Sequence, residues 1–374
     1  MDVIGIVCEY NPFHNGHKYQ IDKIKKLYPD SIIIAVMSSN FCERGEVSVI
    51  NKWDKTSIAI DNGVNLVIEL PFVFSSQSAD IFSFGALKIL NYLKVKKIVF
   101  GSESNDISLL KDIASLQVNN KEFDSLVKEE IDSGVNYPTA LSNVIKRKLG
   151  KSVNSPNDLL AISYIKEIIK NNYDIEAISI KRTNDYHSTD CNSDIISATA
   201  IRNLIKEDKN ISKYIPWDIN SYKIYKPGMF KLLKYKINIG RDLNNIIDVS
   251  EGIDSRIIKY INISNSYDEL INHVKTKRYT YNKLNRMFIH ILTDLTCDDV
   301  KDIDINYIRV LGMNNTGSKY LKSISKSCSV PIITRYKNND YKELLIEQRV
   351  NNIYSIIVND DSLIKKEIGK PIIR

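Results

Sequence analysis

The sequence predicts an α/β fold: a parallel, Rossmann-like sheet with a helical insertion, followed by a mainly helical C-terminal domain. Two observations carry this prediction. Up to residue 212, short apolar runs alternate with amphipathic helical patterns, which is typical of βα units with right-handed crossovers. Beyond that point helical patterns dominate. We therefore expect two domains, residues 1–212 and 213–374, as the length of 374 residues also suggests.

The expected strands are short and nearly continuous in Ile and Val, as strands covered on both faces should be. They are Val3–Val7, Ile32–Met37, Leu66–Leu70, Lys97–Phe100 and Ile175–Ile180. Between the first four lie amphipathic segments that predict helices at His17–Leu27, Lys52–Asn62 and Asp80–Leu93. Gly63 would end the second of these helices.

One break interrupts the alternation. From Asp106 to Asn171 helical patterns follow one another without a strand, at Phe123–Ile131, Thr139–Leu149 and Leu159–Ile169. We interpret this stretch as a helical insertion that precedes the last strand of the same sheet.

The pattern of the second half begins with a connector, Trp217 to Tyr225. Helices are expected at Ile257–Ile261, Tyr267–Val274, Tyr281–Leu295, Lys319–Lys326 and Tyr341–Ile356. Two short strand candidates, Tyr307–Leu311 and Pro331–Thr334, flank the fourth of these helices.

Composition excludes several classes of protein. No apolar run is long enough to cross a membrane, and the N-terminus reads as a buried strand and not as a signal peptide. The five cysteines are scattered without a C-x-x-C pair, so we expect a reducing, cytoplasmic location and no cysteine-based metal site. The net charge of +7 is compatible with a phosphate-bearing partner but falls short of a dedicated nucleic-acid-binding domain.

The segment Glu9 to His17, EYNPFHNGH, joins the first expected strand to the first expected helix. Parallel sheets bind ligands at the carboxyl ends of their strands, beside helix N-termini whose free N–H groups attract phosphate. His14 and His17 can both face one ligand there, and Gly16 leaves the backbone open to its approach. We predict that both imidazoles donate hydrogen bonds to ATP phosphates as charge builds during attack at the α-phosphate.

The alternative is that these histidines are ordinary polar groups of a loop. Two of the chain's five histidines fall within one tetrapeptide at a strand–loop–helix junction, which favours the functional interpretation because the structural context agrees with the motif.

HNGH in this position resembles the H-x-G-H signature of the nucleotidyltransferase superfamily. The longer EYNPFHNGH resembles the bacterial tRNA(Met) cytidine acetate ligase family. Cys42 and Glu43 depart from the residues expected before Arg44-Gly45. Further segments similar to this family lie along most of the chain, at Met37–Lys55, Leu66–Ala86, Ser155–Lys166, Ile180–His187, Ile196–Arg202, Lys277–Arg286 and Arg309–Gly317.

The resemblance implies a parallel nucleotidyltransferase sheet and an enzyme that activates acetate with ATP to acetyl-adenylate. It also implies acetyl transfer to N4 of the wobble cytidine of elongator tRNA(Met), giving N4-acetylcytidine. ATP is the implied co-substrate, with Mg²⁺ as an optional companion and no residue assigned to a metal. The implied ATP-binding residues, besides the catalytic His14 and His17, are Val7, Cys8, Glu9, Tyr10, Asn11, Pro12, Phe13, Asn15, Gly16, Gln20, Gly101, Asn157, Arg182, Ser197 and Thr199.

Several of these residues also have simpler interpretations. Ser197, in ISATAIR, resembles the superfamily's second phosphate-binding signature, and it would equally make a good N-cap. Gly101 could be a turn glycine, and Asn157 could cap a helix. Arg202 could bind phosphate or be a solvated helix charge.

Residues Lys275 to Arg286, KTKRYTYNKLNR, hold basic and aromatic side chains and no acid. Basic charge meets tRNA phosphates and aromatic faces stack on unpaired bases, so the segment is a candidate tRNA-binding surface, although charge runs are usually solvated. The residues assigned to tRNA are Lys277, Arg278, Tyr279, Lys283 and Arg286.

Two other functions fit parts of the sequence. A small-molecule adenylyltransferase of the pantetheine-phosphate or nicotinate-mononucleotide type would share HNGH, but the long C-terminal part exceeds its needs. A non-catalytic ATP- or RNA-binding scaffold would not require both HNGH and ISATAIR. The stretch FVFSSQSAD after the third strand, Phe72 to Asp80, is the candidate for the acetate pocket.

Overall fold

Eight strands form one sheet in the computed structural model, which describes residues 2–374 except 136, 152, 183–193, 241, 251 and 337–340. The strand order is β5-β4-β1-β2-β3-β6-β7, and β8 pairs with β6. The strands of the N-terminal half are β1 (Val3–Cys8), β2 (Ile32–Ser38), β3 (Leu66–Leu70), β4 (Lys97–Ser102) and β5 (Glu176–Lys181).

These five strands are mutually parallel, so their carboxyl ends meet at one edge of the sheet. Each residue of β2 (IIIAVMS) is buried, as its unbroken apolar run predicts for a central strand. The register pairs Val3 with Ile32 and continues to Cys8 opposite Met37. All five predicted strands are confirmed.

Helices connect the strands in the order that the sequence predicts. Between β4 and β5 the chain forms four successive helices, which confirms the expected helical insertion. The helices up to residue 206 are α1 (Asn15–Leu27), α2 (Lys52–Asp61), α3 (Phe72–Ser75), α4 (Ala79–Tyr92), α5 (Ile107–Asn119), α6 (Phe123–Asp132), α7 (Tyr137–Leu149), α8 (Pro156–Lys170) and α9 (Ala198–Lys206).

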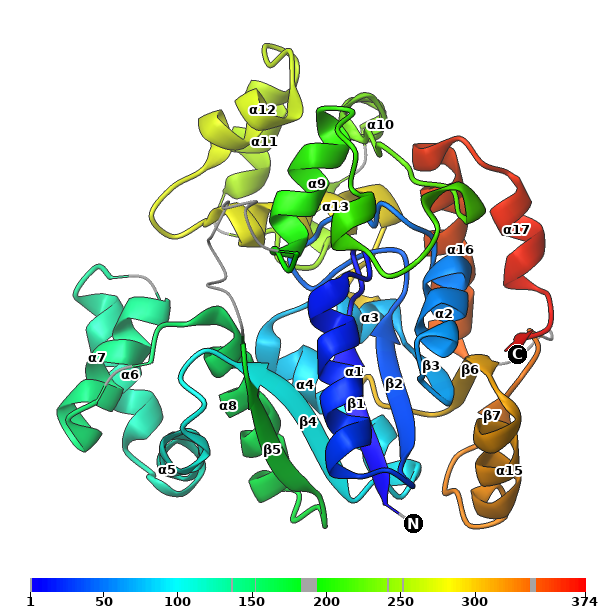
Figure 1. Cartoon of the computed structure of the whole chain (residues 1–374). Coiled ribbons are helices and arrows are strands. Elements are labelled where there is room, and N and C mark those ends of the chain that lie inside the picture. The colour runs from blue at the N-terminus through cyan, green and yellow to red at the C-terminus, as the bar shows by residue number, and fades with distance from the viewer. Residues whose placement is uncertain are drawn as a thin grey trace.

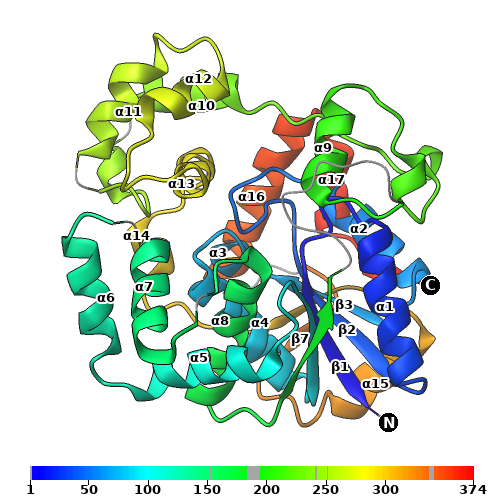
Figure 2. The same ribbon diagram turned by 60° about the vertical axis from the view of Figure 1, so that its left-hand side comes forward.

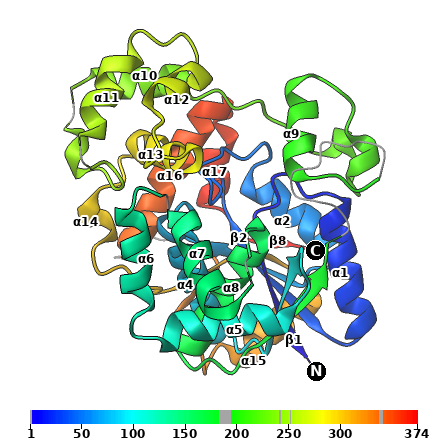
Figure 3. The ribbon, with the colours of Figure 1, turned by 90° about the vertical axis from the view of Figure 1, so that its left-hand side faces the viewer.

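The C-terminal half is mainly helical. Figures 1, 2 and 3 agree in placing α9 to α13 beyond the carboxyl ends of the parallel strands. Short 3₁₀ turns occur at Ser212–Tyr214, Ile219–Ser221 and Leu243–Asn245. The α-helices are α10 (Phe230–Asn238), α11 (Ile253–Ile261), α12 (Tyr267–Val274), α13 (Tyr281–Thr293), α14 (Cys297–Val300), α15 (Asn315–Ile324), α16 (Lys342–Val358) and α17 (Ser362–Glu367).

The C-terminal half also contributes to the sheet. Strand β6 (Ile308–Met313) pairs antiparallel with β3, and β7 (Ile332–Ile333) and β8 (Ile372–Ile373) pair parallel with β6. Both predicted C-terminal strands are thus present. The division of the chain at residue 212 stays a prediction.

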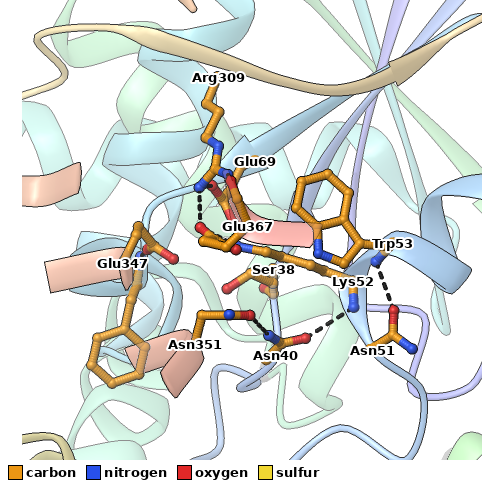
Figure 4. A network of polar contacts seen from close by, with 12 residues as sticks. Ser38, Asn40, Asn51, Lys52, Trp53, Glu69, Arg309, Glu347, Asn351 and Glu367 are labelled. Carbon is orange, nitrogen blue, oxygen red and sulfur yellow. Dashed lines mark hydrogen bonds and ion pairs between the residues drawn. The ribbon is translucent and has the colours of Figure 1, made fainter. Parts of the chain in front are cut away.

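A buried ion cluster joins the two halves (Figure 4). The Lys52 ammonium on α2 lies 2.6 Å from Glu69 Oε1 on β3 and 2.8 Å from Glu367 Oε2 on α17. The Arg309 guanidinium on β6 contacts the same two carboxylates, and its Nη2 donates to the Glu367 carbonyl at 2.8 Å. Because charges are buried only when paired, α17 is held at the α2 and β3 side of the sheet.

Candidate functional site

A cavity of about 600 Å³ opens where β1, β4 and β5 end, beside the first turns of α1, α8 and α9. The structure gathers at it all the residues predicted to bind ATP except Pro12, Phe13 and Asn15. The predicted residues that line it are Val7, Cys8, Glu9, Tyr10, Asn11, His14, Gly16, His17, Gln20, Gly101, Asn157, Arg182, Ser197 and Thr199.

The two histidines are fixed by the start of α1. His14 is the N-cap residue, and its Nδ1 accepts a hydrogen bond from the Gly16 amide at 3.0 Å. The His17 Nδ1 accepts from the His14 amide at 3.2 Å. This reciprocal pair is a capping box in which imidazoles replace the usual hydroxyl and carboxylate. The rings stack with centroids 3.8 Å apart.

These hydrogen bonds determine which nitrogen carries the proton. Because each Nδ1 accepts, the proton of a neutral ring must be on Nε2. Burial, together with Arg182 and Arg202, lowers the pKa of His14 to about 3. Burial, His14 and Arg182 also lower the pKa of His17. Both imidazoles are therefore neutral at pH 7, and each carries its N–H on Nε2. No hydrogen bond among the described residues engages either Nε2, and both histidines line the cavity.

Gly16 has a second reason to be glycine. A Cβ at this position would lie 2.8 Å from His14 Cε1 and 3.0 Å from His14 Nδ1, closer than carbon atoms can approach without displacement. The absent side chain therefore makes room for the capping ring, besides leaving the backbone open to a ligand.

The remaining residues of the motif hold the loop in place. Phe13 is fully buried, and its carbonyl accepts from Trp217 Nε1 at 2.9 Å. Asn15 Nδ2 donates to the carbonyls of Asp194 and Lys213 at 2.8 and 2.9 Å. Phe13 and Asn15 thus contact the protein rather than the cavity in this structure.

The opposite wall comes from β4, β5 and α8. Asn157 Nδ2 donates to Glu103 Oε1 at 2.5 Å, and Glu103 also lies 3.8 Å from the Arg182 Nε. Asn157 does not cap α8, because Ser155 occupies the N-cap position. At Gly101 the nearest atom to an added Cβ would be Arg182 Cγ, at 3.2 Å. The glycine therefore lets the arginine side chain lie against the strand.

The start of α9 forms a third wall. Ser197 is the N-cap, as its simpler interpretation predicts, with Oγ accepting from the Ala200 amide at 3.1 Å. Arg202 is not a solvated helix charge: it donates to the Asn11 carbonyl at 2.9 Å, to Thr199 Oγ1 at 3.1 Å and to Glu46. The part Ile180–Arg182 of the segment Ile180–His187 lies at this site, and its remainder lies outside the described residues.

Sequence reasoning missed Lys55, which lies behind the cavity loop, and several charged residues that line the cavity, among them Glu43 and Glu46. Lys55 is fully buried, and its ammonium donates to the carbonyls of Glu9, Ser38 and Ser39 at 2.8, 2.9 and 2.5 Å, which fixes the ends of β1 and β2. Glu43 lines the cavity and lies 3.3 Å from Arg286 Nη1. Burial raises the pKa of Glu43 to about 7. The sequence feature that could have identified Lys55 is its position on the apolar face of the predicted helix Lys52–Asn62.

The residues assigned to tRNA differ in their surroundings. Lys277 and Arg278 are exposed, and Lys283 is half-buried, with Nζ 4.5 Å from the Tyr279 ring centre. Tyr279 is buried, with its hydroxyl donating to the Ser250 carbonyl at 2.7 Å. Arg286 reaches the cavity wall through Glu43.

The proposed acetate stretch, Phe72 to Asp80, lies mostly under the cavity. It forms α3 and the start of α4, Phe72 to Gln77 are buried, and Ala79 alone of these residues lines the cavity.

Among the described residues no group of three or more His, Cys, Asp or Glu side chains could hold a metal ion. Across the same residues, no helix combines the length and apolar character needed to cross a membrane.

Comparisons with known proteins agree with this geometry. A family model described as HIGH Nucleotidyl Transferase matches residues 1–367. A tRNA(Met) cytidine acetate ligase of Clostridium kluyveri is 35% identical over 404 residues, covering 100% of this chain and 99% of the relative. One from Thermosipho africanus is 38% identical and covers 92% and 88%.

Solved structures give the same result. The crystal structure of apo Thermotoga maritima TmcAL has a TM-score of 0.90 at 29% identity, covering 100% of this chain and 99% of that one. The same protein bound with α-thio ATP gives 0.87 at 30% identity and the same coverage. The chain belongs to the tRNA(Met) cytidine acetate ligase family.

Proposed function

We propose that this chain is an ATP-dependent ligase of the cytoplasm that activates acetate as acetyl-adenylate. It then transfers the acetyl group to N4 of the wobble cytidine of elongator tRNA(Met), forming N4-acetylcytidine. The observation that carries the proposal is the pair of neutral imidazoles, His14 and His17, at the start of α1 in a cavity that Arg182 also lines.

In the first step an oxygen of acetate attacks the α-phosphorus of ATP. The new O–P bond forms as the bond to the bridging oxygen breaks, and pyrophosphate leaves. Acetate is ionised at neutral pH and needs no base, so this step rests on positioning and on neutralising phosphate charge. The Nε2–H groups of His14 and His17 and the guanidinium of Arg182 supply donors and charge. Mg²⁺ carried on the triphosphate would add charge of the same sign.

In the second step the N4 nitrogen attacks the carbonyl carbon of acetyl-adenylate. The bond from that carbon to the phosphate oxygen breaks, AMP leaves and N4 loses one proton. The wobble base must lie outside the anticodon stack, which costs least for an unpaired loop nucleotide. Exposed Lys277 and Arg278 would hold the tRNA phosphates.

Pyrophosphate exchange into ATP tests the proposal. Exchange that depends on acetate supports it. Exchange that depends on a phosphorylated metabolite would indicate a small-molecule adenylyltransferase, and no exchange would indicate a scaffold.

Replacing Lys277 and Arg278 with Ala should weaken tRNA binding and spare acetate-dependent exchange. Equal loss of both activities would contradict this division of roles.

A further inference from the structure

Helix α13 packs directly on the cavity turn, Glu43 to Glu46. Gly45 has a φ of +72°, and a Cβ there would lie 2.3 Å from the Arg286 amide nitrogen. Arg286 also pairs with Glu43. Asn282 of the same helix lines the cavity. The first turns of α13 therefore form part of the rim of the ATP cavity, at the carboxyl side of the sheet (Figure 3).

Tyr281, the first residue of α13, is a partly exposed aromatic side chain next to Asn282. It is 44% exposed, whereas Tyr279, two residues earlier, is buried and hydrogen-bonded. Partial burial raises the pKa of Tyr281, and a hydrogen bond with Asn285 lowers it. The Asp268 and Glu46 carboxylates also raise it, while Arg202 opposes them. In the chain, Tyr281 directly precedes Asn282, which lines the same cavity as Glu46 and Arg202.

Glu46 is an anionic carboxylate in the cavity that we assign to ATP, which is itself a polyanion. Glu46 therefore suits a second ligand that carries hydrogen-bond donors. Its side chain is one-third exposed, and the Nη2 of Arg202 lies 2.9 Å from Oε1 and 2.8 Å from Oε2. Each carboxylate oxygen has a second lone pair, so both can accept a further hydrogen bond. Arg202 also donates a hydrogen bond to the carbonyl of Asn11, in the loop that carries His14. Glu43 is a weaker candidate because its side chain is less exposed than that of Glu46, 21% against 33%. A carboxylate accepts well from the exocyclic amine of cytosine.

We propose that Tyr281 and Glu46 form the acceptor-base subsite: the Tyr281 ring stacks on the unpaired wobble cytidine, and Glu46 accepts a hydrogen bond from its N4 amine. The inference rests on the proposed function and adds which side chains hold the acceptor. Stacking on an aromatic face is insensitive to base identity, so Tyr281 supplies affinity and Glu46 supplies the choice of cytidine. The arrangement brings N4 from the α13 side toward the loop that carries His14.

Steady-state acetylation of elongator tRNA(Met) tests Tyr281. Tyr281→Ala should lower kcat/KM for tRNA about ten- to hundredfold, the usual effect of losing one stacked base, and Tyr281→Phe should stay within about twofold of wild type because the ring remains. Tyr235→Ala, at an exposed tyrosine on α10, is the matched control and should be unchanged. Acetate-dependent exchange should be unaffected in all three variants.

Wild-type acetylation reports on the proposed function, and the ratio of variant to wild type reports on Tyr281, so the two ideas fail separately. Wild-type turnover in Tyr281→Ala would overturn the stacking role. So would an equal loss in the Phe and Ala variants, or a parallel loss of exchange, because either result would mean that the ring does not act on the base.

Discrimination between two RNAs tests Glu46. Wild-type enzyme should bind an anticodon stem-loop with cytidine at the wobble position about tenfold or more tighter than one with uridine, which lacks the N4 donor. Glu46→Gln should reduce that ratio toward one, because an amide can rotate to donate to uridine O4. Tyr281→Ala should weaken both RNAs by the same factor. A Glu46→Gln variant that keeps the wild-type ratio would overturn the assignment.

Discussion

His14 and His17 stack with ring centroids 3.8 Å apart, and each Nδ1 accepts a backbone amide of the same helix start. In each ring Nδ1 takes part in the helix cap, and the protonated Nε2 remains available to a ligand. Two neutral donors beside the positive end of a helix dipole suit a phosphate that gains negative charge in the transition state.

The first prediction separates the two roles of His14. In His14→Asn the side-chain oxygen can still cap α1, but the Nε2–H donor is lost. Acetate-dependent exchange should fall about 10²- to 10³-fold, as when one oxyanion donor is removed, with the free energy of unfolding changed by less than about 1 kcal/mol. Exchange kinetics and urea unfolding measure the two effects, and wild-type exchange rates in this variant would refute the donor role.

The second prediction concerns stability in acid. The pKa of His14 is about 3 in the folded chain against 6.5 ordinarily, so between these values the unfolded chain binds more protons. Stability should therefore be fully present above about pH 6.5 and fall as the pH drops below it, by about 2 kcal/mol from this group at pH 5.

The same variant provides the control for this pH effect. His14→Asn lacks the titrating ring, so its loss of unfolding free energy between pH 7 and pH 5 should be smaller than that of wild type by about that amount. Unfolding in urea at the two pH values gives the difference. Identical losses in both proteins would mean that the ring is not held neutral by burial.

The third prediction tests the contact between the cavity turn and α13. In Gly45→Ala the new Cβ would sit on a residue with positive φ and would clash with backbone atoms of Asn285 and Arg286. The substitution should therefore lower the free energy of unfolding by about 3 kcal/mol or more. Gly134 also has a positive φ but nothing within 4 Å of an added Cβ, so Gly134→Ala should cost only about 1–2 kcal/mol. Equal costs in urea unfolding would show that α13 does not press on the turn.

The fourth prediction concerns the buried cluster in Figure 4. Glu367→Ala removes a carboxylate shared by Lys52 and Arg309 and leaves excess positive charge without solvent, which should cost about 3–5 kcal/mol. Lys365→Ala, on the exposed face of α17, is the control and should change stability by less than about 0.5 kcal/mol. A loss in Glu367→Ala no larger than the control's would mean that the cluster does not hold α17.

Local patterns predicted much of this protein. The unbroken apolar runs at Ile32–Met37 and Leu66–Leu70 mark strands because both of their faces are covered. The tetrapeptide HNGH marks the start of α1 because its residue types fit a phosphate-binding junction. The family prediction, which rested on such segments, is confirmed by relatives over the whole chain.

Contacts between distant segments could not be predicted in this way. Whether Tyr279 or Tyr281 faces solvent depends on how α13 packs, which periodicity over one turn does not determine. The pairing of Glu43 with Arg286 joins residues 243 positions apart, and no local signal selects it. The antiparallel addition of β6 to β3 is of the same kind, because a short apolar run does not specify its neighbour.

The most direct test of the whole account is the mass of the wobble nucleoside after elongator tRNA(Met) has been incubated with enzyme, ATP and acetate. We predict a cytidine heavier by one acetyl group, formed only when both ATP and acetate are present and at a rate about 10²- to 10³-fold lower with His14→Asn. An unmodified cytidine in the complete reaction would contradict the account.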